Sequence, residues 1–305
     1  MRFEDKIAKL RIEKHDGRET SEFLVDVKKL CDGEAIEYLL GQVDFCDAKV
    51  DLSLRPMIPR PETEFWVREA IEEMNEGLGM KDEEAREQVK PVRVLDIFSG
   101  SGCVGLAVLK NIPNSNVTFI ELAPHLKEQI EISIKKNKFD ENRIEVLTGD
   151  TFDPLARSFL ALDPARKDPL GVIPMKMGIQ VKNLKNTDLD PRFREDDINT
   201  EHNNKFDYIF AVPPYVPPQM KDEVMKELTA ETPLCFFDKE DGFFYIKKVL
   251  NEVRNYLNIR GELFIEFDIT QREKIEELIK ENKFENYSFL KDPYGHECVV
   301  RIKMD

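Results

Sequence analysis

The sequence lacks long apolar runs and any regular spacing of cysteine or histidine. No apolar run approaches the roughly 18–20 residues that a membrane-spanning helix requires, so no membrane association is expected. The five cysteines include no C-x-x-C pair and the four histidines are scattered, so we predict reduced thiols and no metal site. Acids outnumber bases, 60 Asp+Glu to 45 Lys+Arg, and the formal net charge of −15 disfavours direct nucleic-acid binding.

The sequence does contain enough apolar material for one large core. Of 305 residues, 41% are hydrophobic and 34% are charged, so a densely charged surface is expected. Residues 1–55 show helical spacing of apolar residues and predict a short helical N-terminal region. Residues 56–91 predict a connecting segment with a helix that begins at Pro61, followed by a polar linker. Residues 92–305 predict the main domain.

From residue 92 onward, apolar strands alternate with helical segments. The alternation predicts parallel βαβ units, with helices on both faces of a doubly wound sheet. The C-terminal segments FENYSFLKD and HECVVRIK predict a hairpin that adds an antiparallel strand. Residues from about 156 to 204 interrupt this rhythm with polar, proline-containing sequence, and a surface insertion is expected there. The predicted fold class is α/β with a mostly parallel sheet.

A glycine-rich turn follows the first strand of this domain. Gly100 and Gly102 begin a G-x-G-x-x-G pattern between a strand and a helix, and Glu121 ends the next strand. Glycines let the backbone approach a ligand, and a carboxylate at the second strand tip can accept both ribose hydroxyls of a nucleotide cofactor. These features alone also fit a nicotinamide dinucleotide.

Asp96 distinguishes between the candidate cofactors. Near the tip of the first strand, its carboxylate would repel a pyrophosphate but suits the amino group and sulfonium of S-adenosylmethionine. Asp150 follows the third strand and is expected to meet the adenine amino group, with Phe152 against the ring. Acids at three successive strand tips predict a class I S-adenosylmethionine-dependent methyltransferase with a seven-stranded sheet.

The fourth strand ends in Val212-Pro213-Pro214-Tyr215. This tip lies beside the cofactor in a doubly wound sheet, so it is the expected acceptor site. The segment resembles the N-P-P-Y or D-P-P-Y of methyltransferases that act on planar amide or amine nitrogens. In those enzymes the first side chain and a proline carbonyl accept the two N–H groups, and the aromatic ring packs on the substrate. The resemblance implies a catalytic role for these four residues.

Longer motifs extend the resemblance to one family. They are Ile58-Pro59-Arg60-Pro61-Glu62-Thr63-Glu64, Asp96-Ile97-Phe98-Ser99-Gly100-Ser101-Gly102-Cys103, Thr148-Gly149-Asp150-Thr151-Phe152-Asp153-Pro154-Leu155 and Pro213-Pro214-Tyr215-Val216. From about residue 33 to 305, apart from the insertion, the chain resembles the HemK/PrmC family of glutamine N5-methyltransferases. The resemblance implies methylation of the glutamine in the Gly-Gly-Gln motif of a peptide-chain release factor. It also implies that Arg60 lies near the cofactor and the acceptor.

The chain departs from the family pattern at three places. Val212 stands where the family has asparagine, Thr232-Pro233 stands where it usually has Pro-Arg, and the insertion is long. Valine offers no side-chain acceptor to the substrate amide. Loss of one transition-state hydrogen bond costs about tenfold to several-hundredfold in rate, so we expect Val212 to slow methyl transfer.

Two other functions fit the same motifs. A catalytically impaired pseudoenzyme would bind S-adenosylmethionine or the release factor without turnover. A nucleic-acid adenine N6-methyltransferase would use the same prolyl tip, although the acidic net charge disfavours it. The resemblance implies a mitochondrial protein, while an N-terminus without an import signal leaves a cytoplasmic location as the alternative. A monomer is expected.

Overall fold

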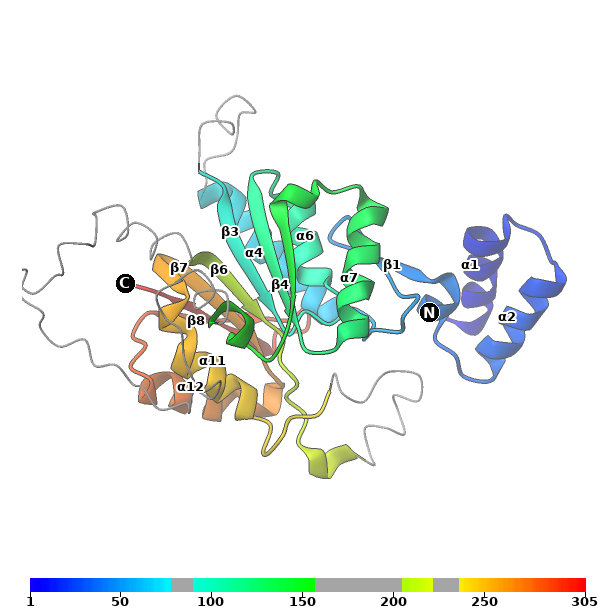
Figure 1. Ribbon diagram of the computed structural model, residues 1–305. Coiled ribbons are helices and arrows are strands. Elements are labelled where there is room, and N and C mark those ends of the chain that lie inside the picture. The colour runs from blue at the N-terminus through cyan, green and yellow to red at the C-terminus, as the bar shows by residue number, and fades with distance from the viewer. Residues whose placement is uncertain (78–89, 157–204, 222–235) are drawn as a thin grey trace, which may run out of the picture.

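A computed structural model describes residues 1–77, 90–156, 205–221 and 236–305. A seven-stranded sheet with the order β5-β4-β3-β6-β7-β9-β8 forms its centre (Figure 1). The strands are β3 (Val92–Ile97), β4 (Ser115–Glu121), β5 (Ile144–Thr148), β6 (Phe206–Ala211), β7 (Leu257–Glu266), β8 (Tyr287–Lys291) and β9 (Glu297–Lys303). The first five are parallel and β9 is antiparallel to both its neighbours. The predicted α/β class and closing hairpin are confirmed.

Helices cover both faces of the sheet, as the doubly wound prediction requires (Figure 1). One face packs against α4, α6 and α7, and the other against α11 and α12. Their bounds are α4 (Pro61–Gly77), α6 (Cys103–Asn111), α7 (Pro124–Asn137), α11 (Phe244–Glu252) and α12 (Arg272–Glu281). Because each sheet face has its own apolar cluster, the parallel strands are buried on both sides, and their carboxyl ends are free to form a site.

The N-terminal region contains three helices and a hairpin. The helices are α1 (Phe3–His15), α2 (Ser21–Cys31) and α3 (Ile36–Leu40), and the hairpin pairs β1 (Gln42–Phe45) with β2 (Ala48–Asp51). The expectation of helices throughout residues 1–55 missed this hairpin. Its turn residues Cys46 and Asp47 both have positive φ, 43° and 66°, as a tight hairpin turn needs. Neither is glycine, so the usual sequence signal is missing.

The hairpin is fixed to α7 by hydrogen bonds. Asp51 N donates to Ser133 Oγ at 3.0 Å, and Gln129 Nε2 donates to Asp51 Oδ1 at 3.0 Å. Lys136 Nζ lies 2.8 Å from Asp51 Oδ2. These contacts hold the pKa of Asp51 down at about 2 although burial would raise it. The N-terminal hairpin is therefore a packed part of the main domain.

Gly105 lets α6 approach β4 closely. A Cβ at this position would lie 2.2 Å from Cε1 of the buried Phe119 ring. We expect Gly105→Ala to lower the free energy of unfolding by about 1–3 kcal/mol, because the ring or the helix must shift. Gly77→Ala is the matched control, since among the described residues nothing beyond its chain neighbours and its own helix backbone lies within 4 Å of its built Cβ, and it should be neutral or slightly stabilising. Denaturant unfolding compares them, and equal losses would contradict the packing role.

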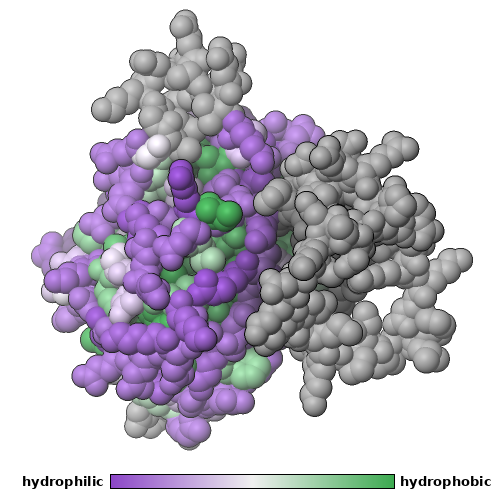
Figure 2. All heavy atoms as spheres, turned by 90° about the vertical axis from the view of Figure 1, so that its left-hand side faces the viewer, coloured by the Kyte–Doolittle hydropathy of each residue, from purple (hydrophilic) through white to green (hydrophobic). Residues whose placement is uncertain are grey.

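Several predicted features lie outside the described residues. These are nearly all of the insertion at 156–204 and the Thr232-Pro233 departure. Within the described ranges, membrane-spanning helices are absent by length and hydropathy. Among the same residues, no three His, Cys, Asp or Glu side chains are grouped as metal ligands. Figure 2 shows one face of the molecule, on which polar side chains predominate around smaller apolar areas.

Candidate active site

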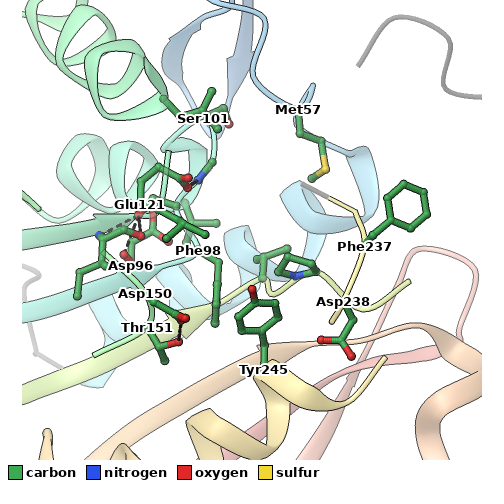
Figure 3. A pocket seen from close by; sticks show the side chains of 18 of the residues that line it. Met57, Asp96, Phe98, Ser101, Glu121, Asp150, Thr151, Phe237, Asp238 and Tyr245 are labelled. Carbon is green, nitrogen blue, oxygen red and sulfur yellow. Dashed lines mark hydrogen bonds between the residues drawn. The ribbon is translucent and has the colours of Figure 1, made fainter. Parts of the chain in front are cut away.

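A cavity of about 460 Å³ lies at the carboxyl ends of the parallel strands (Figure 3). Its volume is in the range of pockets that hold small ligands and cofactors. Each of β3, β4, β5 and β6 is followed by residues that line it, and the start of α4 completes one wall. Lining residues named in the sequence predictions are Arg60, Asp96, Gly100, Glu121, Asp150, Val212 and Pro214.

Asp96 presents a buried carboxylate to the cavity. Its Oδ2 accepts the backbone N–H of Gly105 at 3.0 Å, which fixes the side chain against the start of α6. Burial raises the pKa of Asp96 to about 7, and the nearby charge of Glu121 adds to the rise. A buried carboxylate in this position is stabilised by a cationic ligand group, as the sequence argument for a sulfonium and an amino group requires.

Glu121 connects the tip of β4 to the glycine loop. Its Oε2 accepts the Gly100 N–H and its Oε1 accepts the Ala123 N–H, both at 2.8 Å. Gly100 and Gly102 have positive φ of 53° and 78°, which glycine adopts without strain. Burial raises the pKa of Glu121, partly offset by these backbone donors. The carboxylate therefore shapes the loop beside which the predicted ribose contact would form.

The Asp150 carboxylate lies between two lysines, a pairing that the sequence did not indicate. Its carboxylate accepts the Thr151 hydroxyl at 2.7 Å and forms ion pairs with Lys239 and Lys248, each at 3.2 Å. Although burial raises the pKa of Asp150, the Thr151 hydrogen bond and the lysine charges hold it below its usual value. The adenine contact of Asp150 stays a prediction, and the lysines compete for the same oxygens.

The structure corrects the role expected of Phe152. Its ring is fully buried and stacks on Tyr256, with centroids 4.4 Å apart and an interplanar angle of 8°. Phe152 belongs to the apolar cluster on the α11 and α12 face of the sheet, and it does not line the cavity. The tip of β5 places Thr151 at the cavity and turns the next side chain into the core.

The four residues of the predicted acceptor tip have different surroundings. Val212 and Pro214 line the cavity, whereas Pro213 is buried and Tyr215 is half-buried away from the lining. The Tyr215 carbonyl accepts from Gln271 Nε2 at 3.1 Å, and burial raises the pKa of the Tyr215 hydroxyl. Val212 and Pro214 therefore border the site, and the packing of the Tyr215 ring on the substrate stays a prediction.

The start of α4 is anchored to the tip of β7. Trp66 Nε1 and Thr63 Oγ1 both donate to Glu266 Oε2, at 2.7 and 2.8 Å. Burial raises the pKa of Glu266, partly offset by these two donors. Arg60 and Thr63 line the cavity, so the Ile58–Glu64 motif forms a wall of the site. The proximity of Arg60 to the acceptor tip agrees with what the resemblance implied.

Sequence reasoning missed several polar residues that line the cavity, including three at or near the start of α11. Asp238 and Lys239 lie in a turn before α11, and Tyr245 lies in its first turn. Lys239 Nζ lies 4.9 Å from the centroid of the Tyr245 ring. Loop residues have no periodic pattern that would mark them. The sequence feature that could have indicated these residues is the acid-rich stretch just before the helix.

The sheet order and the cavity at its strand tips define a class I methyltransferase fold. The solved structure of a human methyltransferase 10 domain containing protein has a TM-score of 0.50 with this chain at 11% identity, over 85% of this chain and 89% of that one. A likeness at this identity shows the fold alone. It agrees with the seven-stranded class predicted from the sequence.

Curated proteins resemble this chain over most of its length. No family model matches the sequence. A release factor glutamine methyltransferase of Streptococcus pneumoniae is 26% identical over 93% of this chain and 80% of its own. One of Flavobacterium psychrophilum is 24% identical over 90% and 77%. The chain is a relative of the release factor glutamine methyltransferases, and the resemblance to the HemK/PrmC family is confirmed. This relationship agrees with a methyltransferase that uses S-adenosylmethionine.

Proposed function

We propose that this protein transfers a methyl group from S-adenosylmethionine to the glutamine amide nitrogen in the Gly-Gly-Gln motif of a peptide-chain release factor. The observation that carries the proposal is one cavity lined by both the strand-tip carboxylates and the Val212–Pro214 acceptor tip. The names of the curated relatives support the same substrate class. The proposal includes a mitochondrial location, which the resemblance alone implies, with a cytoplasmic location as the alternative, and a monomeric state.

The residues fit the cofactor by charge and position. Asp96 offers a buried anion to the cationic portion of S-adenosylmethionine, and Glu121 offers carboxylate oxygens beside the glycine loop to the ribose hydroxyls. When bound, the cofactor supplies an electrophilic methyl group. The chain itself supplies position and exclusion of water, because the cavity walls from α4 and the β6 tip enclose the acceptor side.

A methyl-transfer assay tests the function directly. Incubated with methyl-labelled S-adenosylmethionine, the protein is expected to label the glutamine of a release factor's Gly-Gly-Gln domain. A domain with that glutamine replaced by alanine is the control and should stay unlabelled. Mass spectrometry of the tryptic peptide locates the added methyl group.

Two outcomes of this assay would replace the proposal. Binding of S-adenosylmethionine and of the release factor in calorimetry, with no label on the glutamine, would identify the pseudoenzyme. Label on adenine in DNA or RNA, with none on the release factor, would identify the nucleic-acid methyltransferase.

A further inference from the structure

Asp238 carries a buried carboxylate oxygen that the fold leaves without a partner. The residue is 3% exposed and lines the cavity. Its Oδ2 accepts three backbone N–H groups, from Glu240 at 3.3 Å, Gly242 at 2.8 Å and Phe244 at 3.1 Å. Its Oδ1 has no hydrogen-bond partner among the described residues. An unpaired buried acceptor costs folding free energy, so a donor supplied by a ligand would stabilise this oxygen.

The segment that carries Asp238 runs beside the acceptor tip. Asp238 N donates to the Val216 carbonyl at 2.8 Å, and Val216 N donates to the Phe236 carbonyl at 2.9 Å. A Cβ built on Gly242 would lie 2.6 Å from the Tyr215 carbonyl oxygen. The turn at residues 238–242 is therefore in direct contact with the chain that follows the two prolines.

Asp238 lies on the acceptor side of the cavity. Figure 3 shows it across the cavity from Asp96 and Glu121, the two carboxylates assigned to the cofactor. Val212 lines the same cavity and offers only methyl groups. Val212, which lacks a side-chain acceptor, and Asp238, which carries an unpaired one, thus lie on adjoining segments of one cavity wall.

We propose that Asp238 Oδ1 accepts one N–H of the substrate glutamine amide and so replaces the acceptor that Val212 lacks. This inference rests on the proposed function and deepens it. Oδ1 meets the need of the substrate because it is an unpaired carboxylate oxygen on a residue that lines the cavity, and the three backbone donors on Oδ2 hold the side chain in place. A fixed acceptor orients the amide before reaction, and no rearrangement is needed during it.

The Asp238 carboxylate can also take up the proton that the amide nitrogen loses in the transfer. An amide nitrogen is a weak nucleophile because its lone pair is delocalised, and donation of an N–H to a carboxylate increases its electron density. As the N–CH₃ bond forms, the S–CH₃ bond breaks and the sulfonium becomes a neutral thioether. The nitrogen then loses one proton, and Oδ1 is the acceptor already in contact with it.

The test combines Asp238→Asn with Val212→Asn. The three backbone donors hold the asparagine oxygen at the Oδ2 position, so its NH₂ group takes the place of Oδ1. The turn is kept while the acceptor becomes a donor. We expect kcat for the Gly-Gly-Gln domain to fall about tenfold to several-hundredfold. The Kd for S-adenosylmethionine and the Tm should stay near native values.

Rescue separates an acceptor role from a structural one. Adding Val212→Asn to Asp238→Asn should restore kcat by about tenfold or more, because the asparagine returns a side-chain acceptor to the tip. Val212→Asp is a second rescue variant should Val212→Asn unfold. If Asp238→Asn keeps the native kcat, or if neither Val212 variant rescues its loss, this inference is overturned and the proposed function is not. No methylation by any of the proteins, with S-adenosylmethionine still bound, refutes the proposed function and this inference with it.

Discussion

Asp96→Asn is expected to weaken binding of S-adenosylmethionine at about pH 8 roughly 10- to 100-fold. The asparagine oxygen can still accept the Gly105 N–H that Asp96 Oδ2 accepts at 3.0 Å, so the loop is kept. The variant loses the negative charge, which a cationic ligand would otherwise neutralise inside a buried site, and it turns the second carboxylate oxygen into an NH₂ donor. Isothermal titration calorimetry measures the change. An affinity within about twofold of native would contradict the assignment of Asp96 to the cation.

The same residue predicts a pH dependence of cofactor affinity. Burial raises the pKa of Asp96 to about 7, so the carboxylate is charged above that pH and neutral below it. Affinity should therefore be highest on the alkaline side and fall about tenfold for each pH unit below the pKa. Titrations between about pH 6 and pH 8.5 should show this step in the native protein. Asp96→Asn should lose the step and Glu121→Gln should keep it; a step that persists without Asp96 belongs to another group.

Trp66→Ala is expected to lower the free energy of unfolding by about 3–5 kcal/mol. Trp66 is fully buried, and its ring stacks on Phe210 and Phe264 with centroids 6.1 and 6.2 Å apart. The substitution leaves a cavity and also removes the Trp66 Nε1 hydrogen bond to the buried Glu266 carboxylate. Denaturant unfolding measures the loss.

Trp66→Phe distinguishes the two contributions. Phenylalanine keeps most of the ring stack but cannot donate to Glu266, so a loss of about 1–3 kcal/mol is expected from the weakened carboxylate contact. Thr63 still donates to the same oxygen at 2.8 Å, which limits the loss. A loss as large as that of Trp66→Ala would assign the whole effect to the hydrogen bond. A loss below about 1 kcal/mol in Trp66→Ala would contradict a core role.

The sheet, the glycine loop and the two carboxylates beside that loop were predictable because their signals are local. Buried strands appear as continuous apolar runs, and the glycine loop between a strand and a helix specifies its own geometry. Asp96 precedes that loop and Glu121 follows it, each near the end of a strand. Parallel strands bring these ends to one edge of the sheet. Residue spacing was therefore enough to place both carboxylates at the cavity.

The predicted adenine end and the acceptor side of the site were less predictable because distant contacts decide them. Phe152 could face a ligand or the core, and its partner Tyr256 is far along the chain. The two lysines on Asp150 come from the turn before α11 and from α11 itself. Asp238 sits in an irregular turn, where its role depends on which backbone groups bond to Oδ2 and which oxygen is left over. No sequence pattern contains that information.

The anchor between α4 and β7 has a consequence for folding. The Trp66–Glu266 and Thr63–Glu266 hydrogen bonds join residues 200 and 203 positions apart. Contacts of such large sequence separation form late, because a long loop must close before they are gained. The wall that contains Arg60 can be fixed only after β7 has joined the sheet. A nascent or truncated chain that ends before β7 would therefore carry the cofactor motifs in an unfinished site, and methyl transfer would begin only with the complete sheet.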